Sequence, residues 1–281
     1  MQLQMASPLL SEAQYVGGRW HLQSSLGPLS AAMVVDTRPV PPSSCNIDHA
    51  VLWQSFYGHE IECAQPVFDP DCVELMNFSN ANPERVAFSY VLPMSRTRAL
   101  VEFTVFAAQP LSAAALSADL DNAIAQRVNG AAYTLRRSEQ GVLPMGLAMR
   151  SAAEIQPEPP PTYVRAGLFA GAARPATGYA FQRIQRWAAD CAASLANGGL
   201  PIGHRPNPVL LAWMDHLFLH VIQGQPQLAP QLFVDLFARV QSQRLIRFLS
   251  DRGRIADCAA IVLALPLQPF VRQLCRLRPW R

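Results

Sequence analysis

VAFSYVLPMSRTRALVEFTVF, residues 86–106, holds two largely apolar runs separated by a polar stretch. In each run apolar and β-branched residues alternate with other residues, and a period of two is the signature of a half-buried β-strand. The polar residues 93–98 between the runs are typical of a turn. The stretch therefore predicts an antiparallel hairpin, and we expect the neighbouring strands to build a sheet on it.

Glu102 interrupts the second predicted strand, between Val101 and Phe103. A carboxylate at such a position either faces solvent on the wet side of the sheet or lies in an apolar cavity. In the second case burial raises its pKa, which is common at functional sites. The alternation pattern by itself favours the solvent-facing glutamate.

A longer likeness favours the second interpretation. LPMSRTRALVEFT, residues 92–104, resembles the hairpin of the flavin-dependent lycopene cyclases, in which a Leu-Pro-x-Ser strand end leads to a Glu-x-Thr step. In that family the glutamate of this step is held to be the acid/base that works on the end of the polyene. The resemblance implies this catalytic role for Glu102. The order of the surrounding segments, over residues 56–104, follows the family as well.

Two later segments resemble passages that the family places at the flavin. SEQGVLP, residues 138–144, resembles its Glu-x-Gly-x-x-Pro passage, although Glu139 in a solvated turn is the alternative. RPATGY, residues 174–179, resembles its Pro-x-Thr-Gly-Tyr segment and is expected to open a helix that runs to about residue 196. Small residues allow close approach to a flat ring, and a helix N-terminus favours an anionic, reduced flavin. The resemblance implies that the cofactor-binding residues are Gly141, Pro144, Arg174, Pro175, Thr177, Gly178 and Tyr179.

The cofactor implied is FAD in its reduced form, with NAD(P)H as the reductant. No G-x-G-x-x-G turn, the usual pyrophosphate-binding element, occurs near the N-terminus. The resemblance therefore implies that the chain begins after that unit, as a fragment or a truncated product. We expect FAD to be held only weakly by this chain alone.

The fold implied is an α+β fold of the α/β-type flavoprotein kind, with an incomplete FAD/NAD(P)-binding fold, an antiparallel substrate-domain sheet and a C-terminal helical layer. Strands near Val34 and Gly167 are expected to be neighbours. The proposed domains are 1–48, a β-meander remnant of the FAD-binding domain; 49–138, the antiparallel substrate-binding domain; 139–200, the flavin-facing strand and helix; and 201–281, the C-terminal helical region.

Composition excludes some classes of partner. Half of the 281 residues are hydrophobic, 15% are charged, and the net charge is only +3, so nucleic-acid binding is not expected. The six cysteines have no zinc-site or disulfide spacing, which favours reduced thiols in a cytosolic protein.

His216 and His220, with Asp215, could suggest a metal pair, but no further ligand accompanies them. No metal site is expected.

The C-terminal helical region is rich in arginine and aliphatic residues. Such a surface either rests on an anionic membrane or is an ordinary arginine-decorated helical layer. The N-terminus lacks the features of a signal peptide, and no run approaches the ~20 apolar residues of a spanning helix. We expect a cytoplasmic protein, peripheral at the inner face of the bacterial cell membrane. The arginines are Arg244, Arg247, Arg252, Arg254, Arg272, Arg276, Arg278 and Arg281.

The function implied by the resemblance is carotenoid biosynthesis, the proton-initiated and redox-neutral cyclisation of the ends of lycopene to β-ionone-type rings. Two alternatives stay open. One is a related flavoprotein reductase or hydroxylase that acts on another isoprenoid. The other is a truncated, non-catalytic remnant that binds a polyene or lipid.

Overall fold

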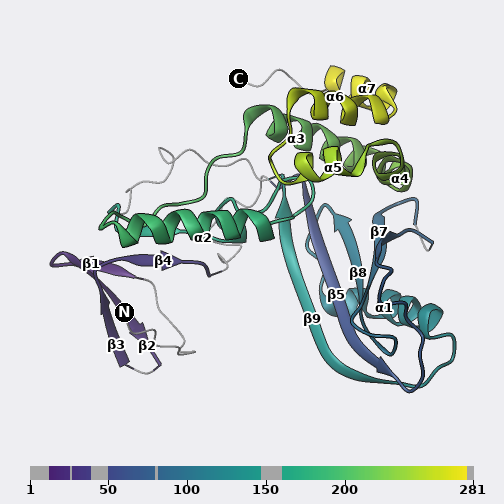
Figure 1. The fold of residues 1–281 in the computed structure, drawn as a ribbon, viewed down its shortest axis with the longest axis horizontal. Helices are drawn as coiled ribbons and strands as arrows, with labels where there is room; N and C mark the ends of the chain where they lie inside the picture. The colour runs from purple at the N-terminus through teal and green to yellow at the C-terminus, as the bar shows by residue number, and fades with distance from the viewer. Residues whose placement is uncertain (1–12, 26, 39–49, 80–81, 147–159, 277–281) are drawn as a thin grey trace. The chain divides into compact units, whose positions relative to one another are not determined.

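The computed structural model describes residues 13–25, 27–38, 50–79, 82–146 and 160–276 (Figure 1). The chain divides into two compact units. Unit 1 comprises Met1–Val40, Met149–Ala173 and Ala180–Pro206, and unit 2 comprises Pro41–Ala148, Arg174–Tyr179 and Asn207–Arg281. The division into four domains stays a prediction.

Unit 1 contains an antiparallel three-stranded meander and a parallel pair formed by β4 and β10. Tyr163 pairs with Val34, which confirms that strands near Val34 and Gly167 are neighbours. Trp20 is buried and its indole N–H donates to Thr162 Oγ1 at 2.9 Å, so the meander is tied to β10. The elements are β1 Gln14–Val16, β2 Arg19–Ser24, β3 Gly27–Ala31, β4 Val34–Asp36, β10 Tyr163–Arg165, a 3₁₀ turn Leu168–Ala170 and α2 Phe181–Ala196.

Unit 2 is built on a five-stranded sheet of order β6-β7-β8-β5-β9, in which every neighbouring pair is antiparallel. The predicted hairpin is confirmed as β7 and β8, which lie in the middle of the sheet. Alternation along these strands gives the sheet two faces of different composition. The strands are β5 Leu52–Cys63, β6 Glu74–Asn77, β7 Val86–Pro93, β8 Arg98–Ala107 and β9 Tyr133–Met145.

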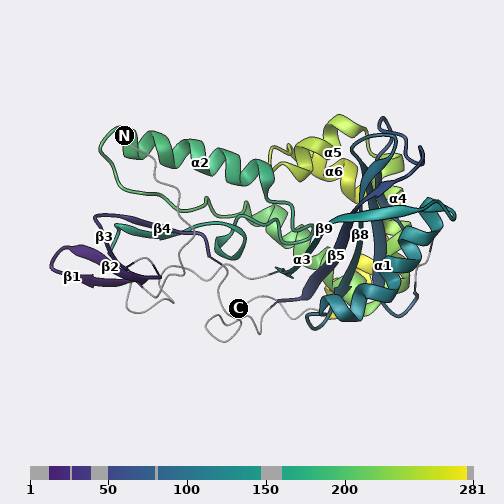
Figure 2. The ribbon, with the colours of Figure 1, turned by 90° about the horizontal axis from the view of Figure 1, so that it is seen from below.

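Helix α1, Ala113–Val128, covers one face of this sheet (Figures 1 and 2). The Ser112 hydroxyl caps the helix by accepting from the Ala115 N–H. Its buried side chains, such as Leu120, pack on the side chains of β8 and β5 that point the same way, such as Val101 and Ile61. This packing forms one of the apolar cores of unit 2.

The opposite face is covered at one end by the C-terminal helices, which gather beyond the ends of β5 and β9 in Figure 1. Phe88 and Phe106 of the sheet pack there with Leu219 of α3 and Phe233 of α4. The predicted C-terminal helical layer is therefore confirmed. Its helices are α3 Val209–Gly224, a 3₁₀ turn Pro226–Leu228, α4 Ala229–Arg239, α5 Ser242–Leu249, α6 Ile255–Ala264 and α7 Leu267–Arg276.

Strand β9 is longer and more regular than the sequence indicates. It runs without interruption through Glu139, so the interpretation of Glu139 as a turn residue was wrong. Pairing along the whole of β5 holds this segment extended, which overrides the turn signal of Gly141. The register shifts between Glu60 and Ile61, where Arg136 is the extra residue on β9.

Residues 174–179 do not begin a helix, which corrects the prediction made for them. They form a closed turn in unit 2, in which the Gly178 N–H donates to the Arg174 carbonyl at 2.9 Å. Gly178 has a φ of +66°, in the left-handed region that a right-handed helix excludes. Helix α2 consequently starts only at Phe181.

Gly141→Ala tests the packing of the sheet face opposite α1. A Cβ at this position would lie 2.4 Å from Cζ of Phe56, so the ring must move. Overpacking of this kind typically costs ~1–3 kcal/mol, and we expect a loss of that size in urea unfolding. Gly224→Ala is the matched control, because a Cβ there meets nothing within 4 Å. Adding Phe56→Leu should recover part of the loss; a Gly141→Ala protein as stable as wild type contradicts the packing.

Candidate functional site

A row of four residues crosses the sheet of unit 2. Tyr90 on β7, Glu102 on β8, Gly58 on β5 and Glu139 on β9 are direct register partners in turn. Partners across antiparallel strands project to the same face, and this is the face that α1 does not cover. Two glutamates thus lie on either side of a glycine.

Glu102 is half-buried, and burial raises its pKa to about 7. A hydrogen bond from Thr104 Oγ1, 2.9 Å from Glu102 Oε1, acts in the opposite direction, and the negative charge of Glu139 adds to the rise. Burial and the nearby Glu102 charge also raise the pKa of Tyr90, so its phenol keeps its proton. Near neutral pH a large share of Glu102 is therefore a carboxylic acid, as the second interpretation of the sequence required.

Gly58 provides the space between the two glutamates. A Cβ at this position would lie 3.3 Å from Cβ and Cγ of Glu102 and 3.4 Å from Cγ of Glu139. A contact of 3.3 Å is tighter than nine in ten real Cβ contacts, so the Glu102 side chain would have to shift. The missing side chain is what lets the two glutamates approach each other across β5.

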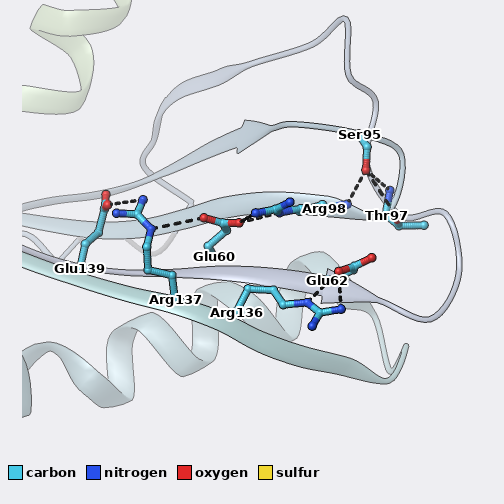
Figure 3. A network of polar contacts seen from close by, with 8 residues as sticks. All are labelled: Glu60, Glu62, Ser95, Thr97, Arg98, Arg136, Arg137 and Glu139. Atoms are coloured by element: carbon cyan, nitrogen blue, oxygen red, sulfur yellow. Dashed lines mark hydrogen bonds and ion pairs between the residues drawn. The ribbon is translucent and has the colours of Figure 1, made fainter.

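Glu139 belongs to a chain of ion pairs with Arg137, Glu60 and Arg98 (Figure 3). Arg137 lies 2.7 Å from Glu139 and 3.3 Å from Glu60, and Arg98 also binds Glu60. The Arg98 guanidinium in particular holds the pKa of Glu60 below its usual value. Sequence reasoning missed this network. A period of two places Glu60 on the face of Gly58 and Arg137 on the face of Glu139, but only the register of β5 and β9 brings Glu60 and Arg137 together.

Glu102 therefore lies at the boundary between an apolar part and a charged part of this sheet face. On one side are Thr104 and the aromatic residues Phe88 and Phe106, which continue into the apolar core under α3 and α4. On the other side are the ion pairs around Glu60. A protonated acid at the border of an apolar region can deliver a proton to an uncharged substrate that avoids water.

The segments predicted to hold the cofactor do lie together. The Gly146 N–H, directly after β9, donates to the Pro175 carbonyl at 3.1 Å. Gly178 lies against Gln54 and Leu143, which are register partners on β5 and β9. The structure thus brings the predicted passage around Gly141 and Pro144 next to residues 174–179.

The side chains in these segments are largely committed to contacts within the chain. The open side of Gly141 is filled by the Phe56 ring, and that of Gly178 by Gln54 Oε1. Arg174 is buried and directed at Asp215. Three of the seven residues assigned to the cofactor are therefore in contact with other parts of this chain. The assignment of these residues to cofactor binding stays a prediction. Gln54 Oε1, beside Gly178, is buried and has no hydrogen-bond partner in the described part of the chain, so it could still accept a hydrogen bond from a ligand.

Asp215, considered with His216 and His220 as a metal ligand, has a different partner. It receives hydrogen bonds from Nε and Nη2 of Arg174, both at 2.9 Å. Burial nevertheless raises the pKa of Asp215, against the effect of the arginine. The pair is a structural connection between residues 174–179 and α3.

Comparison with protein families decides the membership of this chain. The model of the family described as lycopene cyclase protein matches residues 18–275. The chain belongs to the lycopene cyclase family. The match covers the site row as well as residues 174–179, and confirms the family that the hairpin suggested. Among curated protein sequences, none matches this lycopene cyclase family member significantly.

Solved structures resemble this member of the lycopene cyclase family at low sequence identity. The flavin-dependent brominase Bmp2 has a TM-score of 0.50 and 11% identity, over 96% of this chain and 70% of that chain. A geranylgeranyl bacteriochlorophyll reductase-like protein from Thermoplasma acidophilum has a TM-score of 0.45 and 12% identity, over 97% of this chain and 67% of that chain. The Diels-Alderase PyrE3 has a TM-score of 0.42 and 12% identity, over 92% of this chain and 55% of that chain. The brominase likeness indicates a mixed α/β fold of the flavin-dependent enzyme type, with an antiparallel sheet and C-terminal helices.

Glu102→Gln tests the raised pKa without any need for activity. A carboxyl whose folded-state pKa lies above its unfolded value loses stability as the pH rises between the two, because the folded state binds the proton more tightly. Wild type should therefore lose stability relative to Glu102→Gln between about pH 4.5 and 7, and the difference should then stay constant. Thermal unfolding of both proteins from pH 4.5 to 8.5 measures it. Parallel curves across this range contradict the raised pKa.

Proposed function

We propose that this protein closes the ends of lycopene into β-ionone-type rings, with Glu102 as the acid/base. The observation that carries the proposal is the half-buried carboxyl of Glu102, with its pKa raised to about 7, on an uncovered sheet face that adjoins an apolar core. Membership of the lycopene cyclase family supplies the substrate class.

The reaction is balanced without a redox change. The Glu102 carboxylic acid donates its proton to the terminal double bond of the polyene, which leaves a tertiary carbocation. The nearby double bond attacks this carbon and closes a six-membered ring. A ring C–H then loses its proton to the carboxylate, which restores the acid and sets the ring double bond. Substrate and product have the same formula.

The neighbours of Glu102 suit these steps. Partial burial keeps a large share of the acid protonated near neutral pH. Tyr90, its register partner, presents an aromatic ring, and aromatic faces attract cations. The charge of Glu139 across Gly58 adds to the proton affinity of Glu102.

Glu102→Gln is expected to leave lycopene linear in cells that accumulate it. The amide keeps the shape and hydrogen bonding of the side chain but cannot donate a proton to an alkene, and acid–base catalysis is typically worth ~10²–10⁴ in rate. Chromatography of extracted carotenoids measures the ring-ended products. Glu62→Gln, on the same sheet in an exposed pair with Arg136, is the matched control and should cyclise normally.

Two results decide against parts of this proposal. Rings formed at the normal rate by Glu102→Gln remove the acid role from Glu102, and Glu139 is then the next candidate. An inactive wild-type chain that still binds the polyene favours the alternative of a binding protein without catalysis.

We propose reduced FAD, with NAD(P)H as reductant, as the cofactor, on the strength of the family resemblance. When bound, a reduced flavin supplies negative charge close to a developing cation. Because Arg174, Gly141 and Gly178 are committed to internal contacts, this chain should hold FAD weakly.

The purified protein is therefore expected to be colourless after gel filtration. Absorbance near the flavin bands, and fluorescence of the supernatant after denaturation, measure any FAD retained. Stoichiometric yellow protein contradicts the weak binding.

We also propose that the protein works in the cytoplasm, at the inner face of the cell membrane, with α7 at the lipid surface. In the described part of the chain no single helix is long and apolar enough to cross a membrane. Helices α6 and α7 together are long and apolar enough, but the chain bends by 103° between them. Helix α7 exposes Leu267 and Val271 beside Arg272 and Arg276. Arg278 and Arg281, assigned to the same surface from sequence, lie outside the described residues.

Binding to anionic vesicles should fall when Arg272 and Arg276 are both replaced by Gln. Each arginine near an anionic surface contributes ~1 kcal/mol, and added salt screens the attraction. Sedimentation with vesicles at low and high salt measures both effects. Arg205→Gln, an exposed arginine of unit 1, is the control and should bind as wild type does. Salt-independent binding leaves no role for the arginines.

A further inference from the structure

An apolar cavity of about 210 Å³ lies within unit 2, among the C-terminal helices. Its walls come from α3, α4, α5, α6 and α7 and from residues 174–177. Nineteen described residues line it, and three of them are polar: Arg174, Thr177 and Asp215. Protein sites for small molecules are concave, largely apolar and few in number, so the cavity is a candidate binding site.

The polar end of the cavity carries no net charge. Arg174 and Asp215 are 1% and 4% exposed, and they neutralise each other through two hydrogen bonds of 2.9 Å. Arg174 also donates to the Phe248 carbonyl, and its guanidinium carbon lies 4.2 Å from the centre of the Phe248 ring. The charge of the arginine is thus already used within the protein.

This neutrality determines the chemistry of the occupant. An anionic head group would compete with Asp215 for Arg174 and leave one buried carboxylate unpaired, which is strongly unfavourable. A polar, uncharged group would find few partners on walls made mainly of Leu, Ile, Val, Met and aromatic side chains. A hydrocarbon has no polar group to leave unpaired, and it gains about 25 cal/mol for each Å² of apolar surface removed from water.

The cavity reaches an apolar part of the surface. Trp213, Val262, Val271 and Leu274 line the cavity and are nevertheless 39–54% exposed. They belong to α3, α6 and α7, so the mouth opens where these helices meet the surface. An apolar guest can therefore pass from a lipid surface into the cavity without crossing charged protein.

We propose that this cavity binds a single uncharged hydrocarbon chain, which enters between α3, α6 and α7. An acyl tail of a membrane lipid and part of a linear polyene present the same chemistry to these walls, and both are potential sources. Such binding goes beyond the proton transfer assigned to Glu102 and does not depend on it.

The test uses the full chain and the fluorescent, uncharged polyene diphenylhexatriene. Wild type should bind the probe saturably, at one site per chain. This binding should be lost when the mouth of the cavity is blocked. Val262→Trp narrows the mouth and should weaken this binding at least tenfold. Leu263→Trp is the matched control, because Leu263 is the next residue of α6, is 78% exposed and does not line the cavity. Leu274→Trp, on the opposite wall of the mouth, repeats the test if Val262→Trp does not fold.

Competition identifies the chemistry and the source of the chain. Dodecane should displace the probe, and dodecanoate of the same length should do so at least tenfold less well, because Asp215 already neutralises Arg174. Displacement by lycopene but not by phosphatidylcholine assigns the site to the polyene, and the reverse assigns it to lipid tails. Equal weakening by Val262→Trp and Leu263→Trp, no effect of either, or equal displacement by dodecane and dodecanoate overturns the proposal. Loss of activity in Glu102→Gln with unchanged probe binding separates this site from the catalytic one.

Discussion

The pairing of β5 with β8 on one side and with β9 on the other is the constraint on which the site depends. Since partners in an antiparallel ladder share a face, this pairing directs Glu102 and Glu139 away from α1, and the pairing of β7 with β8 does the same for Tyr90. The face they occupy is covered by α3 and α4 at one end only. Glu102 lies where that cover gives way to ion pairs, and this position, more than the residue type, gives it a proton affinity suited to acid catalysis.

A second constraint is the buried pair of Arg174 and Asp215. Breaking such a pair by removing one partner typically costs ~3–5 kcal/mol, so residues 174–179 are firmly connected to α3. The same pair removes net charge from the end of the helical cavity. One ion pair thereby fixes the turn beside β9 and selects which ligands the helical layer can accept.

Much of this architecture could be predicted from local pattern. The hairpin, the helix after it and the C-terminal helices follow periodicities of two and 3.6, and Glu102 stood out because it broke the first of these. The partners of Glu102 could not be found in this way, because Gly58 and Glu139 reach it through the register of a sheet that brings distant segments together. Residues 174–179 were assigned to a helix because the left-handed conformation of Gly178 is invisible in composition.

The register shift between Glu60 and Ile61 has a consequence for how this site can change over evolution. Arg136 is the extra residue on β9, because Leu135 pairs with Ile61 and Arg137 already pairs with Glu60. Deleting Arg136 would remove the irregularity and leave Glu139 opposite Gly58, whereas inserting one more residue directly after Arg136 would place Ser138 opposite Gly58 and turn Glu139 toward α1, because each single step along a strand reverses its side chains. The identity of the second carboxyl therefore depends on the length of a strand, so an insertion at a distance can remove it while every residue of the site stays the same.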